Sequence, residues 1–287
     1  MIKAVIPVAG FGTRMLPAAK SIPKEMMPVV DRPVVQYVVE EAADAGIDDV
    51  LLVTARQKHA IEDHFDRNAE LEERLRSGGK ESLIASVEEL AKRVKIHAVR
   101  QAEQRGLGDA VLQARAHVGD QPFLCMLGDT IFSGDPSPAS QLLAAHQKLK
   151  GAVIGLEEVA AEKVSRYGIV GGMPMGDGVF RLTALVEKPS SEAAPSRLAI
   201  AARYLLTPAI FDCIEKTPPG RGGEIQLTDA LRALLEREPI FGVVLSARRH
   251  DIGNPLDWLK TNVLFAARDP KLRAALLPLL KEILGAG

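Results

Sequence analysis

Close to its start the chain carries the stretch Ala4-Val5-Ile6-Pro7-Val8-Ala9-Gly10-Phe11-Gly12-Thr13-Arg14. Its first five residues are an apolar run of the length expected for a strand buried within a sheet. The glycines that follow let the backbone turn sharply and bring its N–H groups close to a bulky anion. Pro23-Lys24-Glu25 comes a short distance on, so two cations lie near the turn. The stretch predicts either a phosphate-binding loop or a simple glycine turn that joins a strand to a surface helix.

Two common nucleotide-binding patterns do not match this loop. The dinucleotide pattern G-x-G-x-x-G needs a third glycine where Met15 stands. The Walker pattern needs Gly-Lys-Ser/Thr after four intervening residues, and that triplet is absent here. The loop instead combines backbone donors with a hydroxyl, a guanidinium and an ammonium. A nicotinamide-dependent dehydrogenase is therefore disfavoured.

Bulk composition narrows the class of protein. The chain has 287 residues, of which 47% are hydrophobic, enough for one large domain or two modest ones. Its 36 Lys and Arg against 37 Asp and Glu give a formal net charge of −1, so no nucleic-acid or membrane partner is expected. Met1-Ile2-Lys3 leads into a strand rather than a signal peptide, and no apolar run is long enough to span a membrane. We expect a cytoplasmic protein.

The two cysteines give no sign of a metal site or a disulfide. Cys125 and Cys213 lie far apart in sequence, each in an apolar neighbourhood, without metal-ligand spacing. We expect both to be buried free thiols.

Strand and helix patterns alternate along the chain. An apolar strand at 4–8, a helix at 34–45 and a strand at 50–53 predict a βαβ unit, with parallel strands in a sheet covered on both faces. Residues 58–94 have mostly helical signals with one break at 77–79, and the apolar residues Leu83, Val87, Leu90 and Val94 form a packing stripe. Further strands are predicted at 96–99, 122–127, 152–156, 179–186, 199–206 and, as the last one, 240–245. Further helices are predicted at 139–149, 208–216, 230–236, 256–267 and 270–284.

Two features stand out in the second half of the chain. Glycine-rich segments between 167 and 178 punctuate short strands that suit antiparallel pairing. The last helix has a wide apolar surface that suits packing on the core or a dimer contact. With no repeat and no linker, the sequence predicts one domain, or two lobes that share a sheet.

Several polar residues follow predicted strands, where ligands bind in open parallel sheets. Asp129 follows Gly128 at the end of one strand, and Asp251 precedes Gly253 after another. A carboxylate in that position suits a hard cation such as Mg²⁺, or is a turn residue. Glu187-Lys188 would suit a sugar phosphate, although a solvated charge pair explains it as well. The Gly106-Leu107-Gly108 turn suits a flat base or a plain strand-to-helix connection.

The motifs taken together resemble the sugar-phosphate nucleotidylyltransferase family over nearly the whole chain. Each motif is weak alone, but their order is specific, and it is most similar to the bacterial branch that couples UTP to glucose 1-phosphate. Features typical of that branch are the helical stretch at 66–95, the Arg100-Gln101 pair and the segment Gly223-Glu224-Ile225-Gln226-Leu227-Thr228-Asp229. The resemblance implies an α/β fold: a Rossmann-like three-layer α/β/α arrangement around a mostly parallel, mixed central sheet, with a smaller antiparallel portion on the sugar side.

The resemblance also implies roles for individual residues. The nucleoside triphosphate would be held by Ala9, Gly10, Gly12, Thr13, Arg14, Lys24, Gln101 and Gly106. The sugar phosphate would be held by Gly168, Glu187 and Lys188, and the Mg²⁺ ion by Asp129 and Asp251. Arg14, Lys24 and Asp129 would be the catalytic residues. The nucleotide-binding part would span about residues 1–130 and the sugar-phosphate part 131–255, with 256–287 as C-terminal helices suited to oligomerisation.

The implied reaction is a direct displacement. The phosphate oxygen of glucose 1-phosphate would attack the α-phosphorus of UTP and expel pyrophosphate, leaving UDP-glucose and no covalent enzyme intermediate. Because the nucleophile is already an anion, no general base is needed. Mg²⁺, Arg14, Lys24 and loop N–H groups would stabilise the charge on the leaving group. The resemblance implies a homodimer or homotetramer.

The chain departs from the usual pattern of that branch at three places. Gly128-Asp129-Thr130 replaces Pro-Asp-Asp, Asp251-Ile252-Gly253-Asn254 replaces Asp-Cys-Gly-Ser, and Ala202 stands where glycine is common before Arg-Tyr. The first departure is closer to the thymidylyl and N-acetylglucosamine branches. Two alternatives therefore stay open: a thymidylyltransferase or broad-specificity sugar nucleotidylyltransferase, and a catalytically silent paralogue that modulates an active enzyme.

Overall fold

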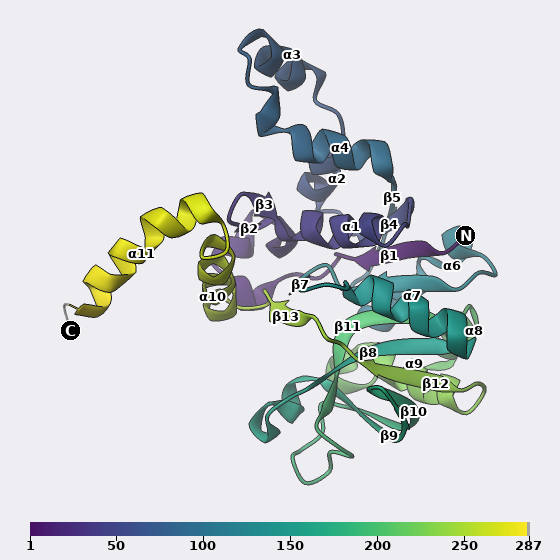
Figure 1. Ribbon diagram of the computed structural model, residues 1–287. Helices are drawn as coiled ribbons and strands as arrows, with labels where there is room; N and C mark the ends of the chain where they lie inside the picture. Colours follow the sequence, from purple (N-terminus) through teal and green to yellow (C-terminus); the bar gives the residue numbers. More distant parts are fainter. Residues whose placement is uncertain (286–287) are drawn as a thin grey trace.

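The computed structural model describes residues 1–285, which are built around a nine-stranded mixed sheet (Figure 1). Its strand order is β5-β4-β1-β6-β11-β8-β12-β10-β9. The strands span β1 (Lys3–Pro7), β4 (Asp49–Thr54), β5 (Lys95–Arg100), β6 (Phe123–Met126), β8 (Ala152–Glu158), β9 (Gly168–Gly176), β10 (Val179–Glu187), β11 (Leu198–Leu206) and β12 (Ile240–Val244).

The first half of this sheet is parallel, and β1, β4 and β6 are buried while the edge strand β5 is mostly exposed. β1 pairs in parallel with β4 on one side and β6 on the other, and β5 continues in parallel beyond β4. Successive side chains of β1 point to opposite faces, so Val5 packs in one core cluster while Ala4 and Ile6 pack in the other. The predicted α/β class with a three-layer arrangement is confirmed.

Helices cover both faces of the sheet. On one face lie α1 (Val34–Asp44) and α7 (Pro138–Leu149), whose apolar residues join the cluster of Ile6. On the other lie α5 (Leu107–Leu112), α6 (Arg115–Val118), α8 (Ala209–Lys216) and α9 (Leu227–Leu235), which join the cluster of Val5. α1 begins after Pro33 and ends before Gly46 at φ 82°, as its sequence predicts. Cys125 and Cys213 are both buried and free, as predicted.

The second half of the sheet is mixed, and the predicted antiparallel portion is present. β11 runs antiparallel to both of its neighbours, β6 and β8, and β10 runs antiparallel to β12 and β9. β9 also pairs with β11, through Leu198 opposite Val170, so this part of the sheet closes on itself. The lower part of Figure 1 shows these strands curling away from the parallel half.

A small two-stranded sheet overturns one prediction. The strand at 240–245 was predicted to be the last strand, and it corresponds to β12. A further strand, β13 (Arg248–Asp251), follows it and pairs antiparallel with β7 (Thr130–Ser133). β13 has the sequence Arg-Arg-His-Asp, without the apolar run or alternation by which strands are predicted. Only its pairing with β7 makes it a strand. That pairing places Asp251 opposite Thr130, next to Asp129.

His250 on β13 should make stability depend on pH. Its Nε2 lies 2.8 Å from Ser133 Oγ, and burial together with the charges of Arg248 and Arg268 lowers the pKa of His250 to about 4. Between pH 6.5 and 4 the unfolded chain binds a proton here that the folded chain does not, so stability falls as pH falls. We expect His250 to account for a loss of about 2 to 3 kcal/mol across this window.

The check is urea unfolding at several pH values for the wild type and His250→Gln. Stability of the variant should fall less steeply between pH 6.5 and 4, because glutamine does not titrate. His64, whose pKa burial also lowers, is present in both proteins and cancels from the comparison. Parallel stability curves for the two proteins would contradict the prediction.

The helical segment after β4 differs in detail from its prediction. It contains α2 (His59–Phe65), α3 (Ala69–Ser77), a 3₁₀ turn (Glu81–Leu83) and α4 (Ala85–Arg93), rather than two helices with one break. Leu90 and Val94 are buried, but Leu83 is 71% exposed and does not belong to the predicted packing stripe. Among the helices of this segment, α3 lies farthest from the sheet in Figure 1, so few core contacts are available to it.

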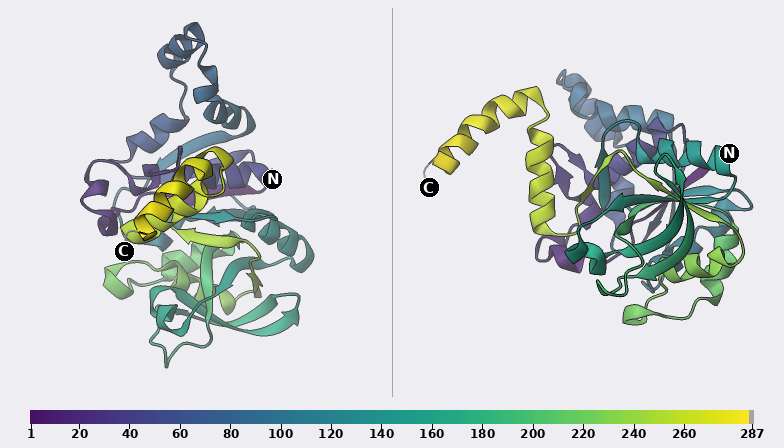
Figure 2. Two further views of the ribbon diagram at one scale, coloured as in Figure 1. Left: turned by 60° about the vertical axis from the view of Figure 1, so that its left-hand side comes forward. Right: turned by 60° about the horizontal axis from the view of Figure 1, so that its bottom comes forward.

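The chain ends in two helices, α10 (Pro255–Ala266) and α11 (Pro270–Gly285). Asn254 caps the start of α10, where its side chain accepts a hydrogen bond from Asp257 N. α11 extends away from the rest of the molecule (Figure 2). The last two residues of the predicted 256–287 segment lie outside the described residues. Near the start, β2 (Pro28–Val29) pairs with β3 (Arg32–Pro33). Among residues 1–285, no helix combines the length and apolar character needed to cross a membrane.

Other boundaries agree with the predictions within one or two residues, except that α9 begins at Leu227 rather than at 230. Leu227 and Thr228 already belong to this helix, and Gln226 is its N-terminal cap.

Candidate active site

A large cleft of about 1950 Å³ opens where the parallel strands end. The loops after β1, β5 and β6 contribute to it, together with the ends of β10 and β13. Of the residues that the sequence predicts for a site, those that line it are Ala9, Gly10, Arg14, Lys24, Gln101, Gly106, Asp129, Gly168, Glu187, Lys188 and Asp251. Gly12 and Thr13 are the predicted site residues that do not appear in the described lining.

The two glycines of the first loop have different roles. Gly12 sits at φ 67°, and a Cβ there would lie 3.3 Å from Cβ and Cγ of Lys24. Gly12 therefore makes the turn and leaves room for the Lys24 stem, although it does not itself line the cleft. Gly10 lines the cleft, and a Cβ there would meet nothing within 4 Å. The protein's own packing thus does not require glycine at position 10, whereas close approach by a bound anion would.

Lys24 and Asp129 form an ion pair on the cleft wall, with 2.5 Å between Nζ and Oδ2. Burial alone would lower the pKa of Lys24, but Asp129 and Glu25 outweigh it and raise that pKa. Burial would likewise raise the pKa of Asp129, but Lys24 and Arg14 hold it below its usual value. Both groups are therefore charged at neutral pH. A lysine held in this way is a preorganised cation rather than a proton donor.

Glu25, which helps to keep Lys24 charged, forms a second buried ion pair, with Lys58. Glu25 Oε2 lies 2.8 Å from Lys58 Nζ, and Glu25 is 2% exposed. Burial raises the pKa of Glu25, although the charges of Lys24 and Lys58 oppose the shift. Lys58 was not among the predicted site residues, because it precedes α2 in a segment without any motif. Its contribution is visible only where the chain brings it against Glu25.

Arg14 lies beside the second predicted metal ligand. Asp251 Oδ1 accepts a hydrogen bond of 2.8 Å from Gly253 N. A Cβ on Gly253 would lie 2.7 Å from Arg14 Nη2 and 2.8 Å from Asp251 Oδ1. Gly253 therefore lets the guanidinium of Arg14 lie close to this turn, and the Asp-x-Gly spacing has a steric reason.

The two aspartates fit a hard cation. Asp251 is opposite Thr130 in the small sheet, and Ile252 N donates to the backbone oxygen of Asp129 at 3.0 Å. Both carboxylates line the same cleft. Oxygen ligands of this kind suit Mg²⁺, which proteins bind through one or two carboxylates together with substrate phosphates and water.

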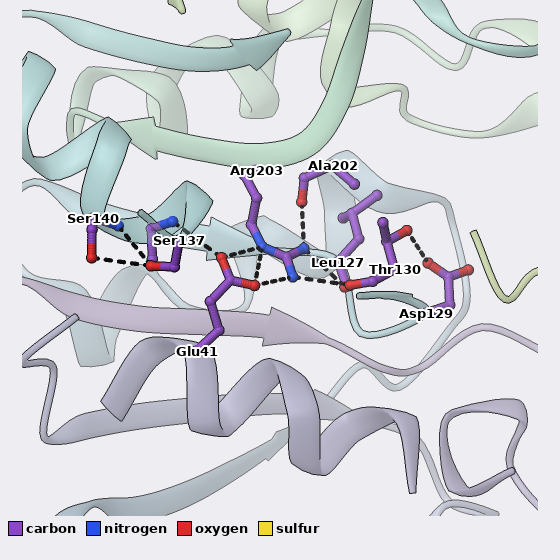
Figure 3. Close-up of polar contacts among 9 residues, drawn as sticks. Glu41, Leu127, Asp129, Thr130, Ser137, Ser140, Ala202 and Arg203 are labelled. Atoms are coloured by element: carbon purple, nitrogen blue, oxygen red, sulfur yellow. Dashed lines mark hydrogen bonds and ion pairs between the residues drawn. The ribbon is translucent and has the colours of Figure 1, made fainter. Parts of the chain in front are cut away.

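The turn that carries Asp129 is held by Arg203, which is fully buried (Figure 3). Its Nη2 donates to Thr130 O at 2.9 Å, and its Nη1 donates to Ala202 O at 3.0 Å and to Leu127 O at 3.4 Å. The Leu127 and Thr130 carbonyl groups lie on either side of Asp129 in the chain, whereas Ala202 belongs to β11. Ala202, at φ 58°, also accepts a hydrogen bond from Leu127 N. The guanidinium thus fixes the backbone on which Asp129 stands.

Glu41 of α1 neutralises this buried arginine. Its Oε2 lies 2.7 Å from Arg203 Nη2, and its Oε1 accepts from Arg203 Nε at 3.1 Å and from Ala139 N at 3.1 Å. The two-point contact and the α7 backbone satisfy the carboxylate. On the other side, a Cβ on Gly128 would lie 2.5 Å from Val8 Cγ1, so only glycine lets this turn pack on β1.

A second cluster lies on the far side of the cleft. Glu187 Oε2 accepts a hydrogen bond of 2.7 Å from Thr228 Oγ1, and its Oε1 lies 3.0 Å from Lys188 Nζ. A Cβ on Gly168 would lie 3.0 Å from the Thr228 hydroxyl and 3.2 Å from Glu187 Oε2. Glu187 is therefore held in place facing the cleft and is not a solvated edge residue. Thr228 was not predicted as a site residue, because the sequence predicts that this helix begins at residue 230, after Thr228.

The Gln101 side chain is tied to its own loop. Its Nε2 donates to Asp109 Oδ2 at 2.7 Å and to Gly106 O at 3.1 Å, which uses both amide hydrogens. A Cβ on Gly106 or on Gly108 would lie 2.8 Å from Ile225 O. Both glycines of this turn therefore allow close packing against residue 225. This packing explains the glycines in a way that differs from the two sequence interpretations, a contact with a flat base and a plain strand-to-helix connection.

Arg249 is a further cleft residue that sequence reasoning missed. Its guanidinium lies 4.3 Å from the centre of the Tyr167 ring and forms an ion pair with Glu157. β13 shows no periodic pattern, so nothing in the sequence indicates that Arg249 or its neighbour Arg248 lines the cleft. The orientation of Arg249 follows from the pairing of β13 with β7.

Comparison with known proteins gives consistent matches over most of the chain. Residues 3–267 match the family model described as nucleotidyl transferase. A Methanocaldococcus jannaschii protein is 50% identical over 282 residues, which is 98% of this chain and 99% of that relative. A Bacillus subtilis protein named UTP–glucose-1-phosphate uridylyltransferase is 45% identical over 98% of this chain and 95% of its own length.

Solved structures agree with these sequence matches. UTP-bound UDP-glucose pyrophosphorylase from Acinetobacter baumannii matches with a TM-score of 0.90 at 39% identity, over 98% of this chain and 99% of that one. A UDP-glucose pyrophosphorylase complexed with UDP-glucose matches with a TM-score of 0.86 at 39% identity, over 92% of this chain and 98% of that one.

Proposed function

Since this chain belongs to the nucleotidyl transferase family, we propose that it transfers a uridylyl group from UTP to glucose 1-phosphate and releases pyrophosphate. The observation that carries the proposal is its likeness over nearly full length to proteins named for this reaction, including structures with UTP and with UDP-glucose. A cleft with cations on one wall and a polar carboxylate cluster on the other suits these two substrates.

The residues of the first wall act by position and charge. Glucose 1-phosphate already carries an anionic oxygen, so the step needs no general base. The barrier comes from bringing two polyanions together and from the charge that builds on the leaving pyrophosphate. Lys24 and Arg14, held by Asp129, Glu25 and the Gly253 turn, stabilise that charge.

Asp129 and Asp251, which both line the cleft, would hold a Mg²⁺ ion. When bound, this ion supplies charge neutralisation at the phosphates of the nucleotide. One carboxylate oxygen of Asp129 accepts a hydrogen bond from Lys24, and one of Asp251 accepts a hydrogen bond from Gly253 N. These contacts orient each carboxylate before any ligand arrives.

Gln101 would read the base through its carbonyl oxygen, since its amide hydrogens are used within the protein. An acceptor at this place matches the N3–H donor of uracil. Thymine presents the same donor, so this contact alone does not separate UTP from dTTP. Discrimination would have to come from the 5-methyl group or from the ribose.

Glu187 and Lys188 would hold the sugar phosphate. The Glu187 carboxylate, fixed by Thr228, accepts hydrogen bonds from sugar hydroxyls, and the Lys188 ammonium contacts the phosphate of glucose 1-phosphate. Gly168 keeps the space beside them open. The nucleotide-binding part, about 1–130, and the sugar-phosphate part, about 131–255, would thus face each other across the cleft.

A substrate panel tests this function. Pyrophosphate release is measured with UTP and dTTP against several sugar 1-phosphates, with Mg²⁺ present. The pair UTP and glucose 1-phosphate should give the highest kcat/KM. A higher value with dTTP would favour the thymidylyltransferase alternative, and absence of release with every pair despite UTP binding would favour the silent paralogue.

We also propose a cytoplasmic homodimer or homotetramer. Support for self-association comes from α11, which extends from the molecule and exposes Leu272, Leu277, Leu279 and Ile283 by 39% to 60%. The number of subunits per particle would be measured for the full chain and for a chain that ends after α10. The same number in both would contradict a role for α11.

A further inference from the structure

Two histidines and one aspartate meet at the end of the sheet away from the cleft. Asp49 is the first residue of β4, His97 lies on β5, and His117 lies on α6. Their ligand atoms all lie within 4.8 Å of one another, and none of the three lines the cleft. The reaction proposed above does not use them.

The fold brings these side chains together by sheet geometry. In the parallel pairing of β4 with β5, His97 is opposite Leu51, so it points to the same face as Leu51 and Asp49. α6 covers that face, since Val118 packs in the cluster that contains Leu51. Each side chain therefore comes from a different element of secondary structure, and no loop movement is needed to assemble the group.

We propose that Asp49, His97 and His117 form a binding site for a zinc-class divalent cation, separate from the catalytic metal. Asp49 Oδ1 lies 2.7 Å from His117 Nε2 and 3.9 Å from His97 Nε2. Ligands about 2.0 to 2.1 Å from a tetrahedral Zn²⁺ are separated by about 3.3 Å. The ion would therefore replace the proton that Asp49 and His117 share in their hydrogen bond, with small rotations of the rings. Imidazole nitrogens favour Zn²⁺, Ni²⁺ or Cu²⁺ over Mg²⁺.

The surroundings prepare the aspartate to act as a one-oxygen ligand. Lys3 Nζ lies 3.4 Å from Asp49 Oδ2 and donates to His117 O at 2.6 Å. Asp49 therefore turns Oδ2 toward the lysine and Oδ1 toward both histidines. Contacts of this kind commonly orient metal ligands. The His97 side chain is 48% exposed, which leaves solvent access for entry of the ion and for a water as fourth ligand.

An ion here would join β4, β5 and α6 and so stabilise the sheet edge. β4 spans six residues, or about 20 Å, between this group and the strand ends that line the cleft. The site therefore predicts an effect on stability and metal content, and no effect on turnover. Its existence does not depend on which nucleotide or sugar the cleft accepts.

Calorimetric titration of ZnCl₂ into chelator-stripped full-length protein, with excess Mg²⁺ to occupy the cleft, tests the site. We expect one Zn²⁺ equivalent per chain, with affinity reduced at least tenfold in His97→Ala and in Asp49→Asn. His59→Ala is the matched control, because His59 is also exposed but lies at the start of α2. His97→Ala removes an exposed side chain, so its folding should be retained.

Thermal unfolding gives a second readout. A concentration of Zn²⁺ a hundredfold above its dissociation constant should raise the Tm of the wild type by about 5 °C and that of His97→Ala by far less. The proposal is overturned if the wild type binds no Zn²⁺ in the presence of Mg²⁺. It is equally overturned if His97→Ala and Asp49→Asn bind the same equivalent as tightly as the wild type.

Discussion

Replacing Lys24 with alanine is expected to lower kcat by about 10² to 10³-fold. Lys24 is the preorganised cation of the cleft, held by Asp129 at 2.5 Å and charged because the neighbouring carboxylates outweigh its burial. Its removal takes away stabilisation of the leaving group and leaves the Asp129 carboxylate without its partner. Steady-state pyrophosphate release with UTP and glucose 1-phosphate measures the effect.

Two variants separate this catalytic role from a loss of fold. Lys20→Ala removes an exposed lysine of the same segment that does not line the cleft, and its kcat should match that of the wild type. Lys24→Arg keeps the charge in a different shape and should recover part of the rate. If Lys24→Ala turns over at the wild-type rate, Lys24 has no part in the mechanism.

Replacing Arg203 with methionine is expected to lower the free energy of unfolding by about 3 to 5 kcal/mol. Arg203 is fully buried, and its removal leaves the Glu41 carboxylate without its charge partner, although the Glu41 side chain is only 9% exposed. The hydrogen bonds that Arg203 donates to the Thr130, Ala202 and Leu127 carbonyl groups are lost at the same time. Urea unfolding measures the loss.

The same arginine should also affect the reaction, because it fixes the turn that carries Asp129. Arg203→Lys keeps the charge but cannot reach all of these carbonyl groups, so it should raise the Mg²⁺ concentration needed for half-maximal rate while the protein stays folded. Arg197→Met breaks an exposed ion pair with Glu158 and should change stability by less than about 1 kcal/mol.

A double variant isolates the ion pair itself. Glu41→Gln combined with Arg203→Met should recover part of the stability lost in Arg203→Met, because glutamine at position 41 carries no buried unpaired charge. Equal losses of stability in Arg203→Met and Arg197→Met would contradict the role assigned to the buried pair.

Elements with a strong local pattern were predictable. β1 and α1 combine an apolar run, a helical period, Pro33 at the start and Gly46 at the end, and each signal depends only on near neighbours. Residues at the ends of such strands must gather at one edge of a parallel sheet. Asp129 was therefore predictable as a cleft residue before any contact was known.

Elements without a local pattern were not predictable. β13 is a strand only because β7 lies beside it, and Arg249 owes its place in the cleft to that pairing. Leu83 fits a helical stripe by spacing, yet it is exposed because the segment turns there. Lys58, Thr228 and the histidines near Asp49 meet their partners across long separations in the sequence.

By itself the sequence determined the α/β class, the strand ends that carry acidic and basic side chains, and the family in which that order of motifs occurs. Only the tertiary structure decided how those side chains are paired and held. It placed Arg203 under the Asp129 turn, set Gly12 against the Lys24 stem and brought Gly106 against residue 225. Backbone periodicity is a local property of the chain, whereas burial, charge pairing and steric room depend on residues that only folding makes neighbours.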